Sequence, residues 1–128
     1  MGEHSFTKAE RLLKPAEFVK VRRRGRKITS RRFTLFVAPN GLGHSRLGLS
    51  VSARVGNSVV RSRMKRLIRE SFRLEKARMG ETLGEPSDIL INVRYARGGP
   101  SLSDVRDELL SALAGKGGRG GGKRGQKG

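Results

Sequence analysis

The segment from Gly56 to Arg73 constrains the fold more than any other part of this chain, because its residues divide between two sides of one helix. At about 100° per residue, the apolar residues fall within one arc: Val60, Met64, Leu67, Ile68 and Phe72. Polar residues lie opposite, namely Ser62, Arg66, Arg69 and Arg73, and three cations border both arcs, namely Arg61, Arg63 and Lys65. We therefore expect an amphipathic helix that packs one side into a core and presents a broad cationic side.

This cationic side carries more charge of one sign than an ordinary surface helix. Four of its cations follow one another at i, i+4 spacing, Arg61, Lys65, Arg69 and Arg73, where like charges destabilise an isolated helix by about a few tenths of a kcal/mol per pair. Only Glu70 and Glu75 stand among nine Arg and Lys residues between Arg54 and Arg78. A polyanion would neutralise these charges with a net gain, because each phosphate that meets a cation releases condensed counterions. A merely solvated face is the alternative interpretation.

The overall charge supports an acidic partner. The chain has 29 Lys and Arg residues against 11 Asp and Glu, a formal charge of +18 and a pI near 11.7. Self-repulsion of this size favours a protein that works while bound to RNA, DNA or an anionic membrane surface. The 128 residues suffice for one domain with a single core, which must rest on Leu, Ile and Val because only 5% of residues are aromatic.

Several classes of site are disfavoured by composition. The chain has no cysteine, which removes disulfides, thiolate nucleophiles and thiolate zinc sites, and its two histidines, His4 and His44, are expected to be exposed rather than to bind metal. No run of about 18 apolar residues is present, and the N-terminus lacks an apolar signal core. We therefore expect a cytoplasmic protein with no membrane partner.

Secondary-structure signals before the basic segment predict one helix and two strands. A short helix is expected from Pro15 to Arg24, with Gly25 as its stop signal and a basic end that extends the positive surface. The segments Arg32 to Ala38 and Arg46 to Ser52 alternate with period two, and turn residues stand between them, which predicts an antiparallel hairpin. A short extra strand near Ile28 is only weakly indicated.

The basic helix should begin at a cap formed by Asn57 or Ser58 and end near Met79 or Gly80. A third strand is expected from Asp88 to Ala96, and the S-x-x-D pattern at residues 101–104 opens a last helix. The expected domain spans residues 11–114, after a flexible N-terminus over residues 1–10. Residues 115–128 contain only Gly, Lys, Arg and one Gln and should form a disordered basic tail, which either holds phosphates loosely or only aids solubility.

The chain offers no convincing set of residues for catalysis. A protein nuclease needs a positioned base, a nucleophile or metal-binding carboxylates. Asp88 and Asp104 are explained by strand-start and cap positions, while Glu70 and Glu75 are expected to pair with neighbouring cations. No glycine-rich phosphate loop of the nucleotide-binding kind is present, so no small-molecule substrate is expected. The residues therefore indicate binding and positioning, with no catalytic residue and no metal ligand in the protein.

The string RLGLSVSARVGNSVVRSRMKRLIRESFR, from Arg46 to Arg73, strongly resembles the signature region of the bacterial ribonuclease P protein subunit. The segments RLLKPAEFVKVRRRGRK, RRFTLFVA and DILINVRYA stand in the order that this family shows, so the resemblance covers roughly residues 11–113. It implies an α/β (α+β) two-layer sandwich, in which a four-stranded, mostly antiparallel sheet with a left-handed β-α-β crossover packs with three helices.

The resemblance also implies a role. In proteins of this family the subunit joins a large catalytic RNA, which removes the 5′ leader of precursor tRNA by magnesium-dependent hydrolysis. The implied partners are the catalytic RNA and precursor tRNA, Mg²⁺ is required by the RNA-containing holoenzyme, and the protein alone binds no cofactor. A ribosomal protein or general RNA chaperone is the alternative, and a peripheral membrane binder is a weaker one, because the chain has no Trp to anchor a helix in lipid.

Two sets of binding residues follow from the resemblance. The set expected to face the catalytic RNA comprises Arg54, Asn57, Arg61, Ser62, Arg63, Lys65, Arg66, Arg69 and Arg73. The set expected in the leader cleft, between the first helix and the sheet, comprises Phe18, Arg22, Phe33, Phe36 and Ser50.

The chain departs from the family pattern at two positions. Ser62 replaces the asparagine of an R-N-R motif, which keeps a hydrogen-bonding group but loses the amide. Arg22 stands where a second aromatic residue often occurs, and its guanidinium plane can still stack on a base. Phe33 and Phe36 lie on opposite faces of their strand, so one of them can serve the core while the other faces the leader.

Overall fold

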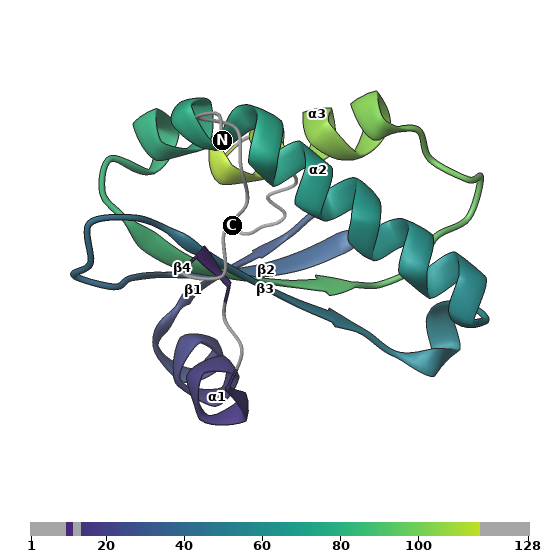
Figure 1. The fold of residues 1–128 in the computed structure, drawn as a ribbon, viewed down its shortest axis with the longest axis horizontal. Coiled ribbons are helices and arrows are strands. Elements are labelled where there is room, and N and C mark those ends of the chain that lie inside the picture. Colours follow the sequence, from purple (N-terminus) through teal and green to yellow (C-terminus); the bar gives the residue numbers. More distant parts are fainter. Residues whose placement is uncertain (1–9, 12–13, 116–128) are drawn as a thin grey trace.

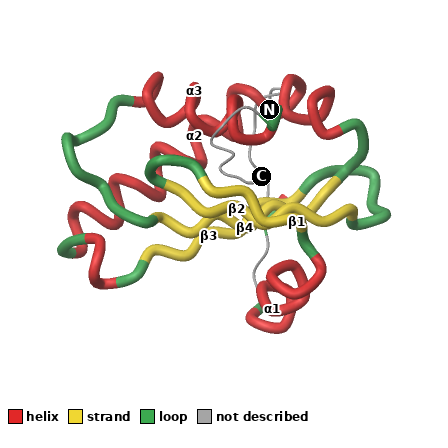
Figure 2. The backbone as a smooth tube through the Cα atoms, turned by 180° about the vertical axis from the view of Figure 1, so that it is seen from behind, coloured by secondary structure: helices red, strands yellow, loops and turns green. Residues whose placement is uncertain are grey.

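The computed structural model describes residues 10–11 and 14–115, so the expected flexible N-terminus and Gly/Lys/Arg tail lie almost wholly outside the described residues. A sheet forms the middle of the molecule (Figures 1 and 2). One helix, α1, lies on one face of this sheet, and two helices, α2 and α3, cover the other face. The elements in chain order are α1 (Pro15–Arg24), β1 (Arg26–Thr29), β2 (Phe33–Pro39), β3 (Arg46–Val51), α2 (Ser58–Leu83), β4 (Ser87–Val93) and α3 (Leu102–Leu113).

The strand order is β1-β2-β4-β3. The β1–β2 and β2–β4 pairs are antiparallel, and β3 pairs with β4 in parallel, so the expected mostly antiparallel four-stranded sheet is confirmed. The predicted hairpin between β2 and β3 is wrong, because β4 lies between these two strands. Its residue Ile91 pairs with Leu35 on one side and with Leu49 on the other. A parallel pair needs a long crossover connection, and α2 supplies it between β3 and β4.

The other expected elements are present, with some shifted bounds. The α1 helix has the predicted ends, and β1 is the weakly indicated strand near Ile28. The α2 helix runs to Leu83, past the expected end near Gly80, because Gly84 rather than Gly80 takes the left-handed conformation that ends the helix, with φ of 82°. Asn57 is its cap, since the Asn57 side chain accepts a hydrogen bond from the Val60 amide at 3.0 Å.

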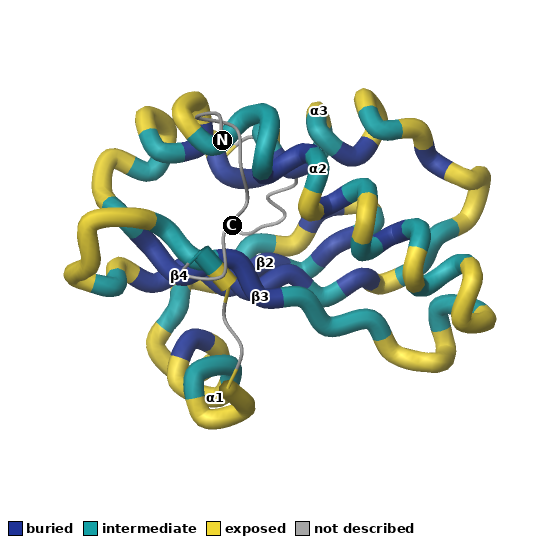
Figure 3. The backbone as a smooth tube through the Cα atoms, viewed as in Figure 1, coloured by how far each residue is buried: buried dark blue, intermediate teal, exposed yellow. Residues whose placement is uncertain are grey.

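Two apolar clusters hold the layers together, and the buried residues lie mainly in the sheet and in parts of the helices (Figure 3). The larger one joins the sheet to α2 and α3 through side chains such as Phe33, Leu35, Ile68, Ile89 and Leu109, each at most 1% exposed. The smaller one joins the opposite face of the sheet to α1 through Val21, Phe36 and Leu90, with Phe18 packed against it. Both faces of β4 are therefore buried, which explains why this strand occupies the middle of the sheet.

The junction between α1 and β1 requires glycine. A Cβ atom at Gly25 would lie 2.5 Å from the Val21 carbonyl oxygen and 3.1 Å from the Val37 amide nitrogen. The Gly25 amide also donates to that carbonyl, at 2.7 Å. The end of α1 is thus held directly against β2, which places the whole helix over that face of the sheet.

Candidate nucleic-acid interface

The α2 helix has the amphipathic division that its sequence predicts. Met64, Ile68 and Phe72 are at most 3% exposed in the core, and Leu67 packs against it. On the opposite side Ser62, Arg66 and Arg69 are exposed. Ser62 and Arg66 also line a shallow surface depression together with Ser58, Val59 and Arg63. The buried side anchors the helix, so the cationic side has a fixed position on the surface.

Three of the α2 cations in the expected RNA-binding set are partly engaged within the protein, besides Lys76 and Arg78, which pair with Glu10 and Glu75. The Arg61 Nε atom donates to the Gly56 carbonyl oxygen at 3.2 Å, and Arg63 Nη2 donates to the Pro100 carbonyl oxygen at 2.8 Å. Arg73 forms an ion pair with Glu70, and its hydrogen bond holds the pKa of the Glu70 carboxyl below its ordinary value. Arg63 therefore ties the segment between β4 and α3 to α2, and it also lines the surface depression beside Ser62 and Arg66.

Three other cations of α2 lack such contacts. Lys65, Arg66 and Arg69 make no hydrogen bond or ion pair with any residue that the structure describes. Removing water from an unpaired charge is costly, so such side chains remain either hydrated or paired with an external anion. Because they lie on one side of α2, a polyanion that runs along this helix can contact all three side chains. Binding breaks no contact that they make with the described residues. We call Lys65, Arg66 and Arg69 the free α2 cations.

Arg54 and Asn57 lie immediately before this surface. Arg54 is exposed in a 3-10 turn over Ala53–Val55, which directly precedes α2. Asn57 is exposed too, but its side-chain oxygen is used in capping α2. A structural role therefore accounts for one acceptor site of the Asn57 oxygen, and its amide nitrogen remains free to donate to an external ligand.

The face of the sheet next to α1 carries a polar strip. Strand register places Thr29, Thr34, Asn92 and Ser50 in one row across all four strands. None of these four residues is fully buried, although the Asn92 Oδ1 atom is buried without a hydrogen-bond partner among the described residues. Sequence reasoning identified Ser50 but missed Thr34 and Asn92, since their alignment depends on β4 lying between β2 and β3. We call this row the polar strip.

Next to this row, side chains of α1 and β2 form an aromatic and cationic group. Phe36 is 9% exposed and packs against Val21 and Leu90, with Phe18 beside them only partly buried. The Arg22 guanidinium lies 6.0 Å from the Phe36 ring centroid, within cation–π range. The structure therefore brings Phe18, Arg22 and Phe36 together on one side of the sheet.

Phe33 does not join this group. Its side chain is fully buried on the other face of the sheet, in the core with α2 and α3. The expectation that Phe33 and Phe36 face opposite sides is confirmed, but the assignment of Phe33 to a leader cleft is wrong. Burial at 0% exposure leaves this ring no surface for a ligand.

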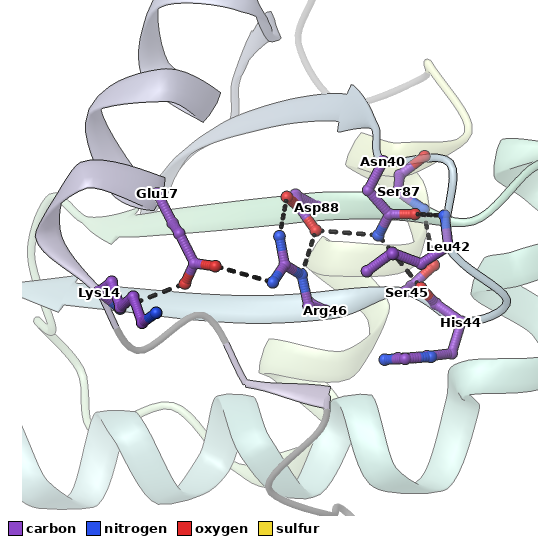
Figure 4. Close-up of polar contacts among 9 residues, drawn as sticks. All are labelled: Lys14, Glu17, Asn40, Leu42, His44, Ser45, Arg46, Ser87 and Asp88. Carbon is purple, nitrogen blue, oxygen red and sulfur yellow. Dashed lines mark hydrogen bonds and ion pairs between the residues drawn. The ribbon is translucent and has the colours of Figure 1, made fainter.

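An ion-pair network fixes α1 over the sheet (Figure 4). Arg46 on β3 donates from Nε and Nη2 to the two carboxylate oxygens of Asp88 on β4, both at 2.8 Å. Its Nη1 atom donates to Glu17 on α1 at 2.9 Å. The Asn40 side chain donates to the same Asp88 carboxylate at 2.9 Å. We call these four residues the Arg46 network; it connects α1, β3, β4 and the β2–β3 loop.

The charges of this network are strongly coupled. Burial alone would raise the pKa of Asp88, but hydrogen bonds from Arg46 and Asn40 outweigh it, so the pKa of this carboxyl lies below its ordinary value. The hydrogen bond to Asp88 raises the pKa of Arg46, against the opposing effect of burial. Sequence reasoning explained Asp88 only by its position at a strand start and missed Arg46, because the local alternation of these strands does not show that Arg46 is paired with Asp88.

Within residues 10–11 and 14–115, no group of three or more His, Cys, Asp and Glu side chains is placed to hold a metal ion. None of the helices within the same residues is both long and apolar enough to pass through a membrane.

Comparisons with known proteins agree with this architecture. The family model for ribonuclease P matches residues 6–116. The chain is 41% identical over 109 residues to the ribonuclease P protein component of Desulforapulum autotrophicum, covering 85% of this chain and 90% of that protein. It is 41% identical over 104 residues to the protein of the same name from Clostridium acetobutylicum, covering 80% and 84%.

Solved structures show the same fold. The Staphylococcus aureus ribonuclease P protein superimposes with a TM-score of 0.70 at 31% identity, covering 83% of this chain and 94% of that one. The Thermotoga maritima ribonuclease P protein gives a TM-score of 0.70 at 28% identity, with coverage of 82% and 96%. The fold and the cationic helix are thus those of the protein part of a ribonucleoprotein. The chain belongs to the ribonuclease P protein component family. Membership implies a role in the ribonuclease that processes tRNA and partnership with its RNA.

Proposed function

We propose that this protein is the RNA-binding subunit of ribonuclease P, and that it binds the catalytic RNA and the 5′ leader of precursor tRNA and assists endonucleolytic removal of the leader. The observation that carries the proposal is the set of free α2 cations on a helix whose other side is locked in the core. The hydrolysis itself is assigned to the RNA with Mg²⁺, and the protein contributes binding and position.

The α2 surface is the proposed contact with the catalytic RNA. Lys65, Arg66 and Arg69 supply charge that no described residue neutralises, and Ser62 lies among them as an exposed hydroxyl. A phosphodiester backbone fits this pattern because it presents repeated single negative charges, and its binding is driven by counterion release. Arg61 and Arg63 keep surface-exposed groups beside their backbone contacts and would border the same RNA.

The proposed leader site lies between α1 and the polar strip. Thr34, Asn92 and Ser50 offer short hydrogen-bonding groups across the sheet, which suit an extended single strand laid over them. Phe18 and Arg22 at the edge provide surfaces on which unpaired bases can stack. The Arg46 network fixes the distance between α1 and the sheet, so this site is formed before the ligand arrives.

Reconstitution tests the proposed function. Addition of the protein to the cognate ribonuclease P RNA should raise cleavage of precursor tRNA at low Mg²⁺ concentration, because the protein strengthens substrate binding. The protein without RNA should cleave nothing, since no group of His, Cys, Asp and Glu side chains in the described residues is placed to hold a metal ion for the hydrolysis. Cleavage by RNA-free protein, or no gain over the RNA alone at any Mg²⁺ concentration, would contradict the proposal.

Replacement of Phe18 with Ala tests the leader site. We expect F18A to weaken binding of leader-bearing precursor by about tenfold, because stacking of one base contributes about 1–3 kcal/mol, and to leave mature tRNA binding nearly unchanged. The measurement is the dissociation constant of both RNAs with the reconstituted holoenzyme. F18L is the control, since it keeps apolar packing against Phe36 but removes the ring, and it should show the same selective loss. Equal losses for both RNAs would place Phe18 outside the leader site.

A further inference from the structure

The outer side of α1 carries a second cationic surface that the proposed function does not use. The inner side of α1 holds Phe18 and Val21 against the sheet. On the outer side a shallow depression of about 490 Å³ is lined, among the described residues, by Ala16, Val19, Lys20, Arg23 and Arg24. All five are exposed, and Val19 is one of the most exposed large apolar side chains, at 49%. We call these five residues the outer α1 face.

The cations of this face have no anionic partner among the described residues. The only acidic residue of α1 is Glu17, whose carboxylate is bonded to Arg46 on the inner side. Asp88 exerts some attraction on Lys20, but its two oxygens are occupied by Arg46. Lys20 and Arg23 lie three residues apart and repel each other. The helix dipole accounts for cations in the last turn but not for Lys20 or for the exposed Val19.

The RNA segment proposed to bind α2 cannot also contact the outer α1 face. The sheet separates α1 from α2 (Figure 1), so one RNA helix on the α2 cations does not reach the far side of α1. The outer α1 face instead adjoins the proposed leader site, whose edge is marked by Arg22. Arg22 contacts the Phe36 ring from the inner side, and Arg23 and Arg24 follow it directly, so cations continue from the leader site around the end of α1.

We propose that the outer α1 face binds the phosphate backbone of the 5′-distal part of the leader, after this strand leaves the polar strip beside α1 and turns over α1. The proposal rests on the proposed function, because it takes the leader as the RNA on that strip. The phosphates meet Lys20, Arg23 and Arg24, and the exposed Val19 side chain provides an apolar surface for a base or ribose.

The length of chain required follows from the size of a helix. With a diameter of about 10–12 Å including side chains, half the circumference of α1 is roughly 17 Å. At the stacked spacing of about 3.4 Å per nucleotide, a strand needs about five nucleotides to pass around it. A leader that ends on the polar strip therefore gains nothing from this face, whereas one about ten nucleotides longer engages it fully.

The test compares two leader lengths in the reconstituted holoenzyme made with full-length protein. Precursor tRNAs with a short leader and with a leader about ten nucleotides longer are bound to wild type and to K20A/R23A over a range of salt concentrations. The logarithm of the affinity falls with the logarithm of the salt concentration, with a slope of about 0.7 per phosphate contact on a single strand. The wild type should therefore show a steeper slope for the long leader than for the short one. K20A/R23A, which removes two contacts, should reduce this difference in slope by about 1.4. Binding of the short leader should not change.

A control variant removes the same charge elsewhere. R78A/R106A deletes two cations from α2 and α3, on the opposite side of the sheet, and should leave the dependence on leader length intact. Both double variants should fold, because Ala has the highest helix propensity and all four sites are on helices. An equal loss for both leaders, no loss for either, or the same effect in the control would overturn the proposal. Failure of wild-type protein to stimulate cleavage of the short-leader substrate would instead contradict the proposed function.

Discussion

Replacement of Arg46 with Ala should lower the free energy of unfolding by about 3 kcal/mol, because it leaves the Asp88 carboxylate buried with a single remaining hydrogen-bond donor, Asn40. The side chains of Arg46 and Asp88 are 21% and 10% exposed, so solvent compensates little of this loss. The variant also releases Glu17 and with it the polar attachment of α1. Urea denaturation measures the effect, and the melting temperature should fall by about 10 °C.

A paired variant separates the network from the loss of one bulky side chain. R46M/D88N removes both charges and keeps most of the volume, so it should be less destabilised than R46A although it changes two residues. If R46A lost less than about 1 kcal/mol, or if the double variant were the less stable of the two, Asp88 would not depend on Arg46 in the way described.

The same network predicts a pH dependence with a definite sign. The pKa of Asp88 is lowered in the folded state, so this carboxylate stabilises the fold above its unfolded pKa of about 3.9 and loses that contribution as pH falls toward the folded pKa. The difference in unfolding free energy between wild type and D88N should therefore be constant near neutral pH and shrink below about pH 4. Glu70 and Asp104 also have a lowered pKa, but both variants retain them, so the difference isolates Asp88.

Replacement of Arg66 and Arg69 together with Ala should have the largest effect on binding of the catalytic RNA. Both cations lack a partner in the described part of the chain, so an RNA contact is the main loss. Each phosphate contact on a duplex contributes about 0.9 to the slope of log affinity against log salt concentration, so the loss of two contacts should lower this slope by about 1.8. Wild-type affinity should then decline about tenfold more than that of the variant between 50 and 200 mM salt. Filter binding to the cognate RNA over this range measures it.

The charge control for this experiment is again R78A/R106A, which should leave the slope nearly unchanged because both side chains are already paired with Glu75. Circular dichroism should show the same helix content for R66A/R69A as for wild type, because neither side chain has a partner in the described structure that would be lost. An unchanged slope in R66A/R69A would mean that the catalytic RNA binds another surface.

Local signals in the sequence were enough to predict that the helices exist and where they begin. The ends of α1 follow from Pro15 and Gly25, and the capping box of α3 is formed by Ser101 and Asp104 as the S-x-x-D pattern predicts. These elements depend on hydrogen bonds between residues three or four apart. The end of α2 was missed because the half-buried Gly80 resembles a stop signal, whereas Leu83, beyond it, packs against the core.

Long-range pairing was harder to predict. The alternation of β2 and β3 shows which residues share a face but carries no information about which strand is the neighbour. Since β4 pairs with both, the polar strip and the Arg46 network join residues more than 40 positions apart, such as Arg46 and Asp88. The residues of the cationic face of α2 were predictable from the sequence. Only the folded structure shows that Arg63 donates a hydrogen bond to the Pro100 carbonyl oxygen, whereas the Arg66 side chain has no partner among the described residues.

The central place of β4 has a consequence for synthesis on the ribosome. The first 86 residues contain β2 and β3 but not the strand that joins them, so the sheet cannot close until residues 87–93 have emerged. Until then the nascent chain exposes the apolar side of α2 together with its positive charges. Closure requires contacts between residues far apart in sequence, which slows folding. The nascent chain is therefore exposed to cellular polyanions while it is positively charged and only partly folded. The pairing of β4 with β2 and β3 completes the core at a late stage.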